Sequence, residues 1–131
     1  MIDNSAKLPE LEEAISLNLL EEGLWKGMAD VRYEANAGMF GGWTVALLLQ
    51  AVIQDDRAIG SPSTLTIHYV NRITPGSELR VRTNPIGGGR SINHWQAEIF
   101  DVNQGVILAY GSIVMANRRP SDNFLEWSST I

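Results

Sequence analysis

The hydrophobic pattern of this chain is dominated by the segment that follows the glycine pair Gly41 and Gly42. From Trp43 to Ile53 almost every residue is apolar, and polar residues resume after it. A helix that is apolar on most sides must be surrounded by protein or by lipid, and a bilayer needs about 20 apolar residues. The run is shorter than that, so the sequence predicts a helix over 42–56 that is buried within the protein.

An alternating pattern, apolar at every second position, follows this helix. It is clearest where Leu65, Ile67 and Tyr69 alternate with polar residues, which is typical of a strand with one buried face. Before the helix, apolar residues recur at helical spacing as far as Gly23. The pattern predicts a helix over 8–20 and a strand over 24–31 before the buried helix, and strands over 63–72, 78–83, 91–101 and 106–117 after it.

These elements predict an α+β fold in which an antiparallel sheet wraps around one long helix. Tight turns join the later strands, so strands adjacent in sequence pair with each other, and a curved sheet of about five to six strands would cover an apolar helix. This arrangement is the hotdog fold in outline. We expect a single hotdog domain over residues 1–131, with an N-terminal helix within 1–23 and a polar tail over 118–131.

Composition narrows the classes of function that remain. The formal net charge of the 131 residues is −5, so no overall positive field attracts nucleic acid or an anionic membrane surface. The chain has no cysteine, which removes disulfides and thiolate metal sites, and no residue cluster has metal-ligand spacing. The first residues lack the basic start and apolar run of a signal peptide. We therefore expect a cytoplasmic protein with no metal and no cofactor.

Several short motifs occur in a fixed order between residues 15 and 117. They are Leu-Asn-Leu at 17–19, Glu-Glu-Gly-Leu-Trp-Lys-Gly at 21–27, Phe-Gly-Gly at 40–42, His-Tyr-Val-Asn-Arg at 68–72 and Gly-Arg-Ser at 89–91. With the closing hairpin, these motifs resemble the N-terminal half of the medium-chain acyl-CoA thioesterase II family, whose members are double hotdogs. The resemblance implies an acyl-CoA ligand and hydrolysis of its thioester.

The resemblance also suggests where catalytic residues would lie. In that family an Asp, a Thr and a Gln of the C-terminal hotdog orient the attacking water. The corresponding positions here are Ile53 for the Asp, Ser63 for the Thr and Ile113 for the Gln. Ser63 alone keeps a polar group, so it is a catalytic candidate; the alternative is a hydroxyl that satisfies backbone groups where a strand begins.

The glycine pair is the second candidate, because thioester hydrolysis needs donors for the developing oxyanion. Free N–H groups at the start of a helix attract carbonyl oxygens and anions, and Gly41 and Gly42 leave them open. We assign Gly42 to catalysis and Gly41 and Phe40 to substrate binding. Close packing of strand and helix is an equally weighted alternative.

Gln50 and Asp55 are the remaining catalytic candidates on the predicted helix. A buried amide such as that of Gln50 needs a polar partner, which structural pairing would also supply. Asp55 follows the helix at its C-terminal end, where the dipole disfavours negative charge and would raise the pKa toward that of a base. The alternative for Asp55 is an exposed loop acid.

Arg90 and Ser91 follow three consecutive glycines. The segment lacks the helix and the lysine of a phosphate loop, so a flexible turn is the alternative to a substrate-binding role. The family's Gly-Arg-Ser at this point implies that Arg90 meets the phosphates of coenzyme A. Arg72, Arg80 and Arg82 form a local basic group that suits the same ligand or solvent.

We predict that the subunit assembles at least into a homodimer, because a single layer of sheet leaves its edge strands open. The ligand would then bind between subunits, with its thioester at Gly42. An alternative from another class is a non-catalytic acyl-CoA-binding or structural hotdog that pairs with a catalytic hotdog chain. Ile53 and Ile113, at the positions of the family's Asp and Gln, favour this alternative.

Overall fold

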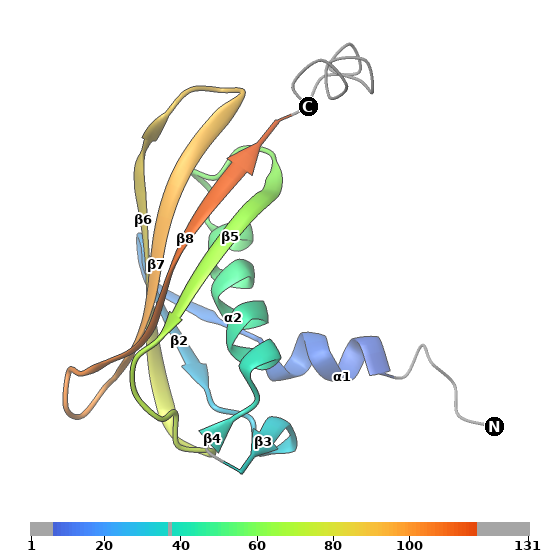
Figure 1. Cartoon of the computed structure of the whole chain (residues 1–131), viewed down its shortest axis with the longest axis vertical. Helices are drawn as coiled ribbons and strands as arrows, with labels where there is room; N and C mark the ends of the chain where they lie inside the picture. Colours follow the sequence, from blue (N-terminus) through green and yellow to red (C-terminus); the bar gives the residue numbers. More distant parts are fainter. Residues whose placement is uncertain (1–6, 37, 118–131) are drawn as a thin grey trace.

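The structure, a computed structural model, describes residues 7–36 and 38–117. One sheet curves around one long helix, and a short helix lies beside the start of the long one (Figure 1). The elements are α1 (Lys7–Ala14), β1 (Asn18–Glu21), β2 (Leu24–Met28), the 3-10 helix η2 (Val31–Tyr33), β3 (Glu34–Ala35), β4 (Gly38–Met39), α2 (Gly41–Gln54), β5 (Ser61–Tyr69), β6 (Glu78–Gly88), β7 (Ile92–Asp101) and β8 (Ile107–Ala116).

The sheet has six strands in the order β1-β2-β6-β7-β8-β5, and all its neighbours pair antiparallel. β5, which follows α2 directly, therefore lies at one edge, and β1 lies at the other. Inward and outward residues alternate along each long strand, as the period of two predicts. In β6, for example, Leu79, Val81 and Thr83 are buried against the helix side, while Arg82 is exposed. The α+β hotdog architecture expected from the sequence is confirmed.

Helix α2 is covered by its own sheet on one side rather than on all sides. The buried residues of the helix are Trp43, Thr44, Leu47, Leu48, Ala51 and Val52. The opposite face carries the half-buried Val45, Ala46 and Leu49 and ends at Ile53, which is 51% exposed. The expectation of burial on all sides is wrong for the single chain, because one layer of sheet can cover only one face of a helix.

The N-terminal region differs from the predicted helix over 8–20. The helix ends at Ala14, and Asn18–Glu21 forms strand β1, which pairs with β2 across a turn at Gly23. Gly23 has φ +77°, and a Cβ there would lie 2.8 Å from the carbonyl oxygen of Thr83, so this turn requires glycine. β2 ends at Met28, before the predicted limit of 31. The predicted tail over 118–131 lies outside the described residues.

Each of three tryptophans in the core has a partner for its indole N–H. Trp43 donates to the carbonyl of Ala14 at 2.9 Å, which ties α2 to α1, and Trp25 donates to Thr83 at 3.1 Å. Trp95 donates to Asn93 at 2.7 Å. These three rings are therefore held in fixed orientations within the core. Within the described ranges, no helix has the length and apolar character that crossing a membrane requires.

Candidate active site at the start of the long helix

The first turn of α2 leaves backbone donors open. The carbonyl oxygen of Phe40 accepts hydrogen bonds from the amides of Trp43 (3.0 Å) and Thr44 (3.3 Å), and the Phe40 side chain provides no cap. The amides of Gly41 and Gly42 precede these bonds, and no acceptor for them lies among residues 7–36 and 38–117. With respect to the described residues, these two N–H groups at the positive end of the helix dipole are therefore available to a carbonyl or anionic oxygen.

Two aromatic rings occupy the space that side chains at the glycine pair would fill. A Cβ at Gly41 would lie 3.2 Å from the Tyr69 hydroxyl, and one at Gly42 would lie 2.5 Å from a ring carbon of Phe40. The Tyr69 hydroxyl also donates to the carbonyl oxygen of Gly41 at 3.1 Å. The glycines thus have a packing role at this turn, alongside the open amides. Both rings are more than half exposed.

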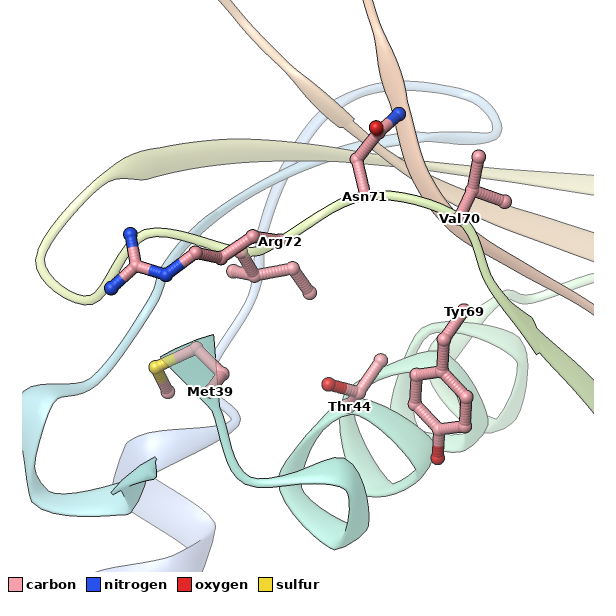
Figure 2. Close-up of a pocket in the computed structure, with 7 residues that line it drawn as sticks. Met39, Thr44, Tyr69, Val70, Asn71 and Arg72 are labelled. Atoms are coloured by element: carbon pink, nitrogen blue, oxygen red, sulfur yellow. The ribbon is translucent and has the colours of Figure 1, made fainter. Parts of the chain in front are cut away.

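A pocket of about 270 Å³ opens beside this turn, between the start of α2, strand β4 and the segment that follows β5. Figure 2 shows its lining residues around a common space, with the Arg72 side chain extended at one end and Thr44 on the helix. The lining is apolar where Val70 and Ile73 contribute and polar at the two ends. The complete lining is Met39, Thr44, Tyr69, Val70, Asn71, Arg72 and Ile73.

Thr44 was not singled out by the sequence, yet it is the lining residue with the most distinctive environment. Its side chain is almost completely buried, since the residue is only 1% exposed. Its hydroxyl makes no hydrogen bond to another described residue. Every fully enclosed side-chain polar atom in that part of the chain does have a hydrogen-bond partner. The Thr44 hydroxyl is therefore not fully enclosed, and it is open to the pocket. The signal in the sequence was a hydroxyl in an otherwise apolar stretch of helix.

The other end of α2 carries a buried ionic cluster instead of an open site. Asp55 accepts hydrogen bonds from the Arg57 amide (3.0 Å), from its Nε (2.9 Å) and Nη2 (2.9 Å), and from the Thr83 hydroxyl (2.8 Å). Thr83 in turn accepts from Trp25, and Arg57 also pairs with Glu22 at 3.0 Å. The cluster anchors the end of α2 to strands β2 and β6.

The pKa of Asp55 moves in the direction opposite to the one expected from the helix dipole. Burial by itself would raise the pKa of this carboxyl, but the hydrogen bonds from Arg57 and Thr83 and the charge of Arg57 outweigh burial and hold the pKa below its ordinary value. The expectation of a raised pKa was wrong because Arg57, two residues on, turns back onto the carboxylate. Asp55 is held ionised and fully hydrogen-bonded.

The other predicted site residues do not meet at Gly42 within one chain. At 1.5 Å per residue, α2 separates Gly42 from Asp55 by about 20 Å. Exposed Ser63 lies near the start of β5, at the Asp55 end. Arg90 and Ser91 are exposed in the turn between β6 and β7, which is tied to the same end by the bond from Asn93 to the Ile59 carbonyl at 3.2 Å. Gln50, midway along α2, is half-buried on the uncovered face.

The predicted basic group is split by the structure. Arg80 pairs with Glu78 at 2.7 Å, and Arg82 pairs with Glu98 at 2.6 Å on the outer face of the sheet. Arg72 lies apart from both, at the pocket, and forms no ion pair within the described ranges. Only Arg72 of the three is therefore placed to meet a ligand near α2.

The family is shown by comparison with known proteins. A family model described as the acyl-CoA thioesterase N-terminal domain matches residues 30–116, and the chain belongs to this family. The match includes α2, the pocket and strands β5 to β8. No curated protein matches the chain.

Solved structures share the fold at low sequence identity. A hotdog-fold protein of unknown function from Alicyclobacillus acidocaldarius superposes with a TM-score of 0.78 at 22% identity, over 88% of this chain and 42% of that one. A candidate thioesterase II from Thermobifida fusca gives 0.72 at 17%, over 87% and 41%. The phenylacetic acid degradation protein PaaI from Thermus thermophilus gives 0.71 at 16%, over 83% and 99%. The chain spans less than half the length of the first two proteins.

Proposed function

We propose that this chain is a single hotdog unit of an acyl-CoA thioesterase, with the thioester bound at the first turn of α2. The observation that supports this most directly is the pair of open amides at Gly41 and Gly42 beside a pocket, in a chain of the acyl-CoA thioesterase N-terminal domain family. The absence of cysteine suits the reducing cytoplasm, where we propose the protein works.

The proposed chemistry is the attack of water on the thioester carbonyl. The carbonyl oxygen becomes an oxyanion, the amides of Gly41 and Gly42 stabilise it, and collapse of the intermediate expels the thiol of coenzyme A and leaves a carboxylic acid. None of the described lining residues is an acid or a histidine. A general base for the water must therefore come from a second hotdog unit or from a side chain outside the pocket.

We propose that a second copy of the chain completes the site. β5 is an edge strand with a free side, and the apolar side chains of Phe40 and Val70, at the start of α2 and just beyond β5, are at least half exposed. Two β5 strands paired antiparallel about a two-fold axis would bring the start of one beside the end of the other. Ser63 of one subunit would then approach Tyr69 and the pocket of the other.

The second candidate is a non-catalytic half that pairs with a different, catalytic hotdog chain. It is favoured by Ile113, which is fully buried in β8 at the family's Gln position. Ile53, at the Asp position, likewise offers no group that can hold water. Under this reading the uncovered face of α2 and the edge of β5 bind the other chain, and this chain contributes only the acyl-CoA pocket.

The experiment is an assay of free thiol released from acyl-CoAs of graded chain length by the purified chain. We expect turnover that falls at least tenfold when Gly42 is replaced by Val, because the added side chain must displace Phe40 from the mouth. The variant Gly105→Asn serves as a control, since the space around Gly105 is open and Asn tolerates its φ of +70° better than a β-branched residue does. Absence of turnover with every chain length, by a chain that binds acyl-CoA, would leave only the second candidate.

A further inference from the structure

The pocket beside α2 has the chemistry of a site for a small organic anion. Its lining includes Thr44, whose hydroxyl makes no hydrogen bond to another described residue and is therefore open to the pocket, since no enclosed side-chain polar atom among those residues lacks a partner. A ligand oxygen or a water in the pocket can accept a hydrogen bond from this hydroxyl. Val70, Ile73 and Met39 supply apolar lining. A ligand that combines an apolar stretch with an oxygen could therefore pack against these three residues and accept a hydrogen bond from Thr44.

Positive charge gathers at the same pocket although the chain as a whole is acidic. Arg32, Arg57, Arg80 and Arg82 all pair with carboxylates, whereas Arg72 at the pocket and Arg90 in the turn after β6 have no carboxylate partner among the described residues. The start of α2 contributes the positive end of its dipole on the other side of the pocket. An anion in this space would therefore meet favourable electrostatics from Arg72 and from the helix. No acid is among the lining residues, and the carboxylate of Glu34, the cross-strand partner of Met39, belongs to an exposed residue.

The Arg72 side chain is positioned by the backbone of β4. A Cβ at Gly38 would lie 2.9 Å from Cγ of Arg72, so the methylene stem of Arg72 rests against a glycine whose φ of +127° is accessible to few other residues. Figure 2 shows the guanidinium and the Thr44 hydroxyl at different ends of the pocket, with Met39 between them in the view. A single small ion would not use both groups, but a short bifunctional ligand would.

We propose that this pocket binds a short acyl group that ends in a carboxylate, with the carboxylate on Arg72 and an oxygen at the other end of the chain accepting a hydrogen bond from Thr44. The volume of about 270 Å³ corresponds to roughly nine water molecules, which leaves room for a dicarboxylic acid of about five carbons. The inference rests on the proposed function for its thioester, but binding of the free acid requires no turnover.

The test is a calorimetric titration of the whole chain with glutarate at low salt and neutral pH. We expect Arg72→Gln to weaken binding about tenfold or more, as loss of a charge-assisted pair does, and Thr44→Val to weaken it about three- to tenfold. Thr44→Ser, which restores the hydroxyl, should bind within about twofold of the wild type. Arg82→Gln, which removes the same charge from the outer face of the sheet, is the matched control.

Several results would overturn the proposal. It fails if glutarate does not bind the wild type, or if binding is unaffected by Arg72→Gln and Thr44→Val. It also fails if 3′-phosphoadenosine 5′-phosphate, the nucleotide part of coenzyme A, shows the Arg72-dependent binding and glutarate does not. Arg72 would then bind a phosphate of the coenzyme and not a carboxylate of the acyl group. A thermal unfolding curve for each variant shows whether lost binding reflects a lost fold. Binding without thioester hydrolysis would refute the proposed function alone.

Discussion

Asp30 and Asp55 carry the same local arrangement in two different environments. Each carboxylate accepts hydrogen bonds from the backbone amide, Nε and Nη2 of the arginine two residues later, Arg32 or Arg57, at 2.7–3.0 Å. The side chain of Asp55 is 4% exposed and that of Asp30 is 19% exposed. Asp55 also receives the Thr83 hydroxyl. Comparison of the two sites therefore separates what the hydrogen-bonded Asp-Arg motif contributes to the free energy of unfolding from what its burial contributes.

We predict that Asp55→Asn lowers the free energy of unfolding by about 2–3 kcal/mol, because it leaves Arg57 and Thr83 without the charge that satisfies them. The same change at Asp30 should cost less than about 1 kcal/mol, since water can replace the carboxylate more easily in this more exposed ion pair. Urea denaturation followed by tryptophan fluorescence measures both. Equal losses in the two variants would show that burial of the Asp55 cluster contributes nothing.

The two substitutions should also differ in their dependence on pH. The pKa of Asp55 is lower in the folded than in the unfolded chain, where it is about 3.9. The contribution of ionised Asp55 to the free energy of unfolding is therefore complete well above pH 4. This contribution is lost as the pH falls through the pKa that Asp55 has in the folded chain. We expect the stability difference between the wild type and Asp55→Asn to be constant from pH 7 to about pH 5 and to shrink below that, as midpoints of urea unfolding at each pH would show.

At the scale of the elements, the sequence predicted those whose periodicity is unambiguous. The alternation of Leu65 and Ile67 with threonines defines β5, and the apolar run after Gly42 defines α2, because burial on a sheet or helix face imposes those periods directly. β1 was missed because Leu19 and Leu20 also fit the helical spacing of the apolar residues before them. Only the antiparallel pairing with β2, a contact set by the turn at Gly23, resolves the ambiguity in favour of a strand.

The candidate site was less accessible to sequence reasoning than the fold. Gly41 and Gly42 were proposed from the sequence because a glycine pair at the start of a helix indicates either open backbone donors or close packing, and the structure has a packing contact at each. Thr44 was overlooked, since its importance depends on whether another residue satisfies its hydroxyl, and Arg72 could not be distinguished from Arg80 until the partners of each were known. Such properties arise from contacts between segments that are far apart in the sequence.

Strand β8 offers a test of the assignment of alternate side chains to the core face and the outer face of the sheet. Ile113 is fully buried between Leu65 and Trp95, whereas its neighbour Val114 faces the outer side and is half-buried. We predict that Ile113→Gln, which installs the residue found at this position in the resembling family, lowers the free energy of unfolding by about 3 kcal/mol, because the amide would be buried without partners. Val114→Gln should cost less than about 1 kcal/mol. A stable Ile113→Gln variant would contradict the assignment of this face to the core.

At the scale of the whole molecule, the chain has two surfaces that a soluble subunit rarely leaves bare. One is the free edge of β5, with nine residues in strand conformation, and open edges of this length invite pairing. The other is the outer face of α2, where Leu49 and Ile53 continue the apolar pattern away from the sheet. The helix that the sequence predicts to be buried on all sides would become so only when a second hotdog covers this face.

We predict that light scattering after gel filtration will give a mass of at least twice the 14.4 kDa of one chain, and that Ile53→Lys will reduce it to that of a monomer. A charge placed in the centre of an apolar interface must be desolvated on association, which costs several kcal/mol. Leu20→Lys is the matched control, because Leu20 is 47% exposed and lies on β1 at the opposite edge of the sheet. If the subunits complete each other's sites, thiol release should fall at least tenfold in Ile53→Lys and remain unchanged in Leu20→Lys. A monomeric wild type, or an active monomeric variant, would instead place the whole site within one chain.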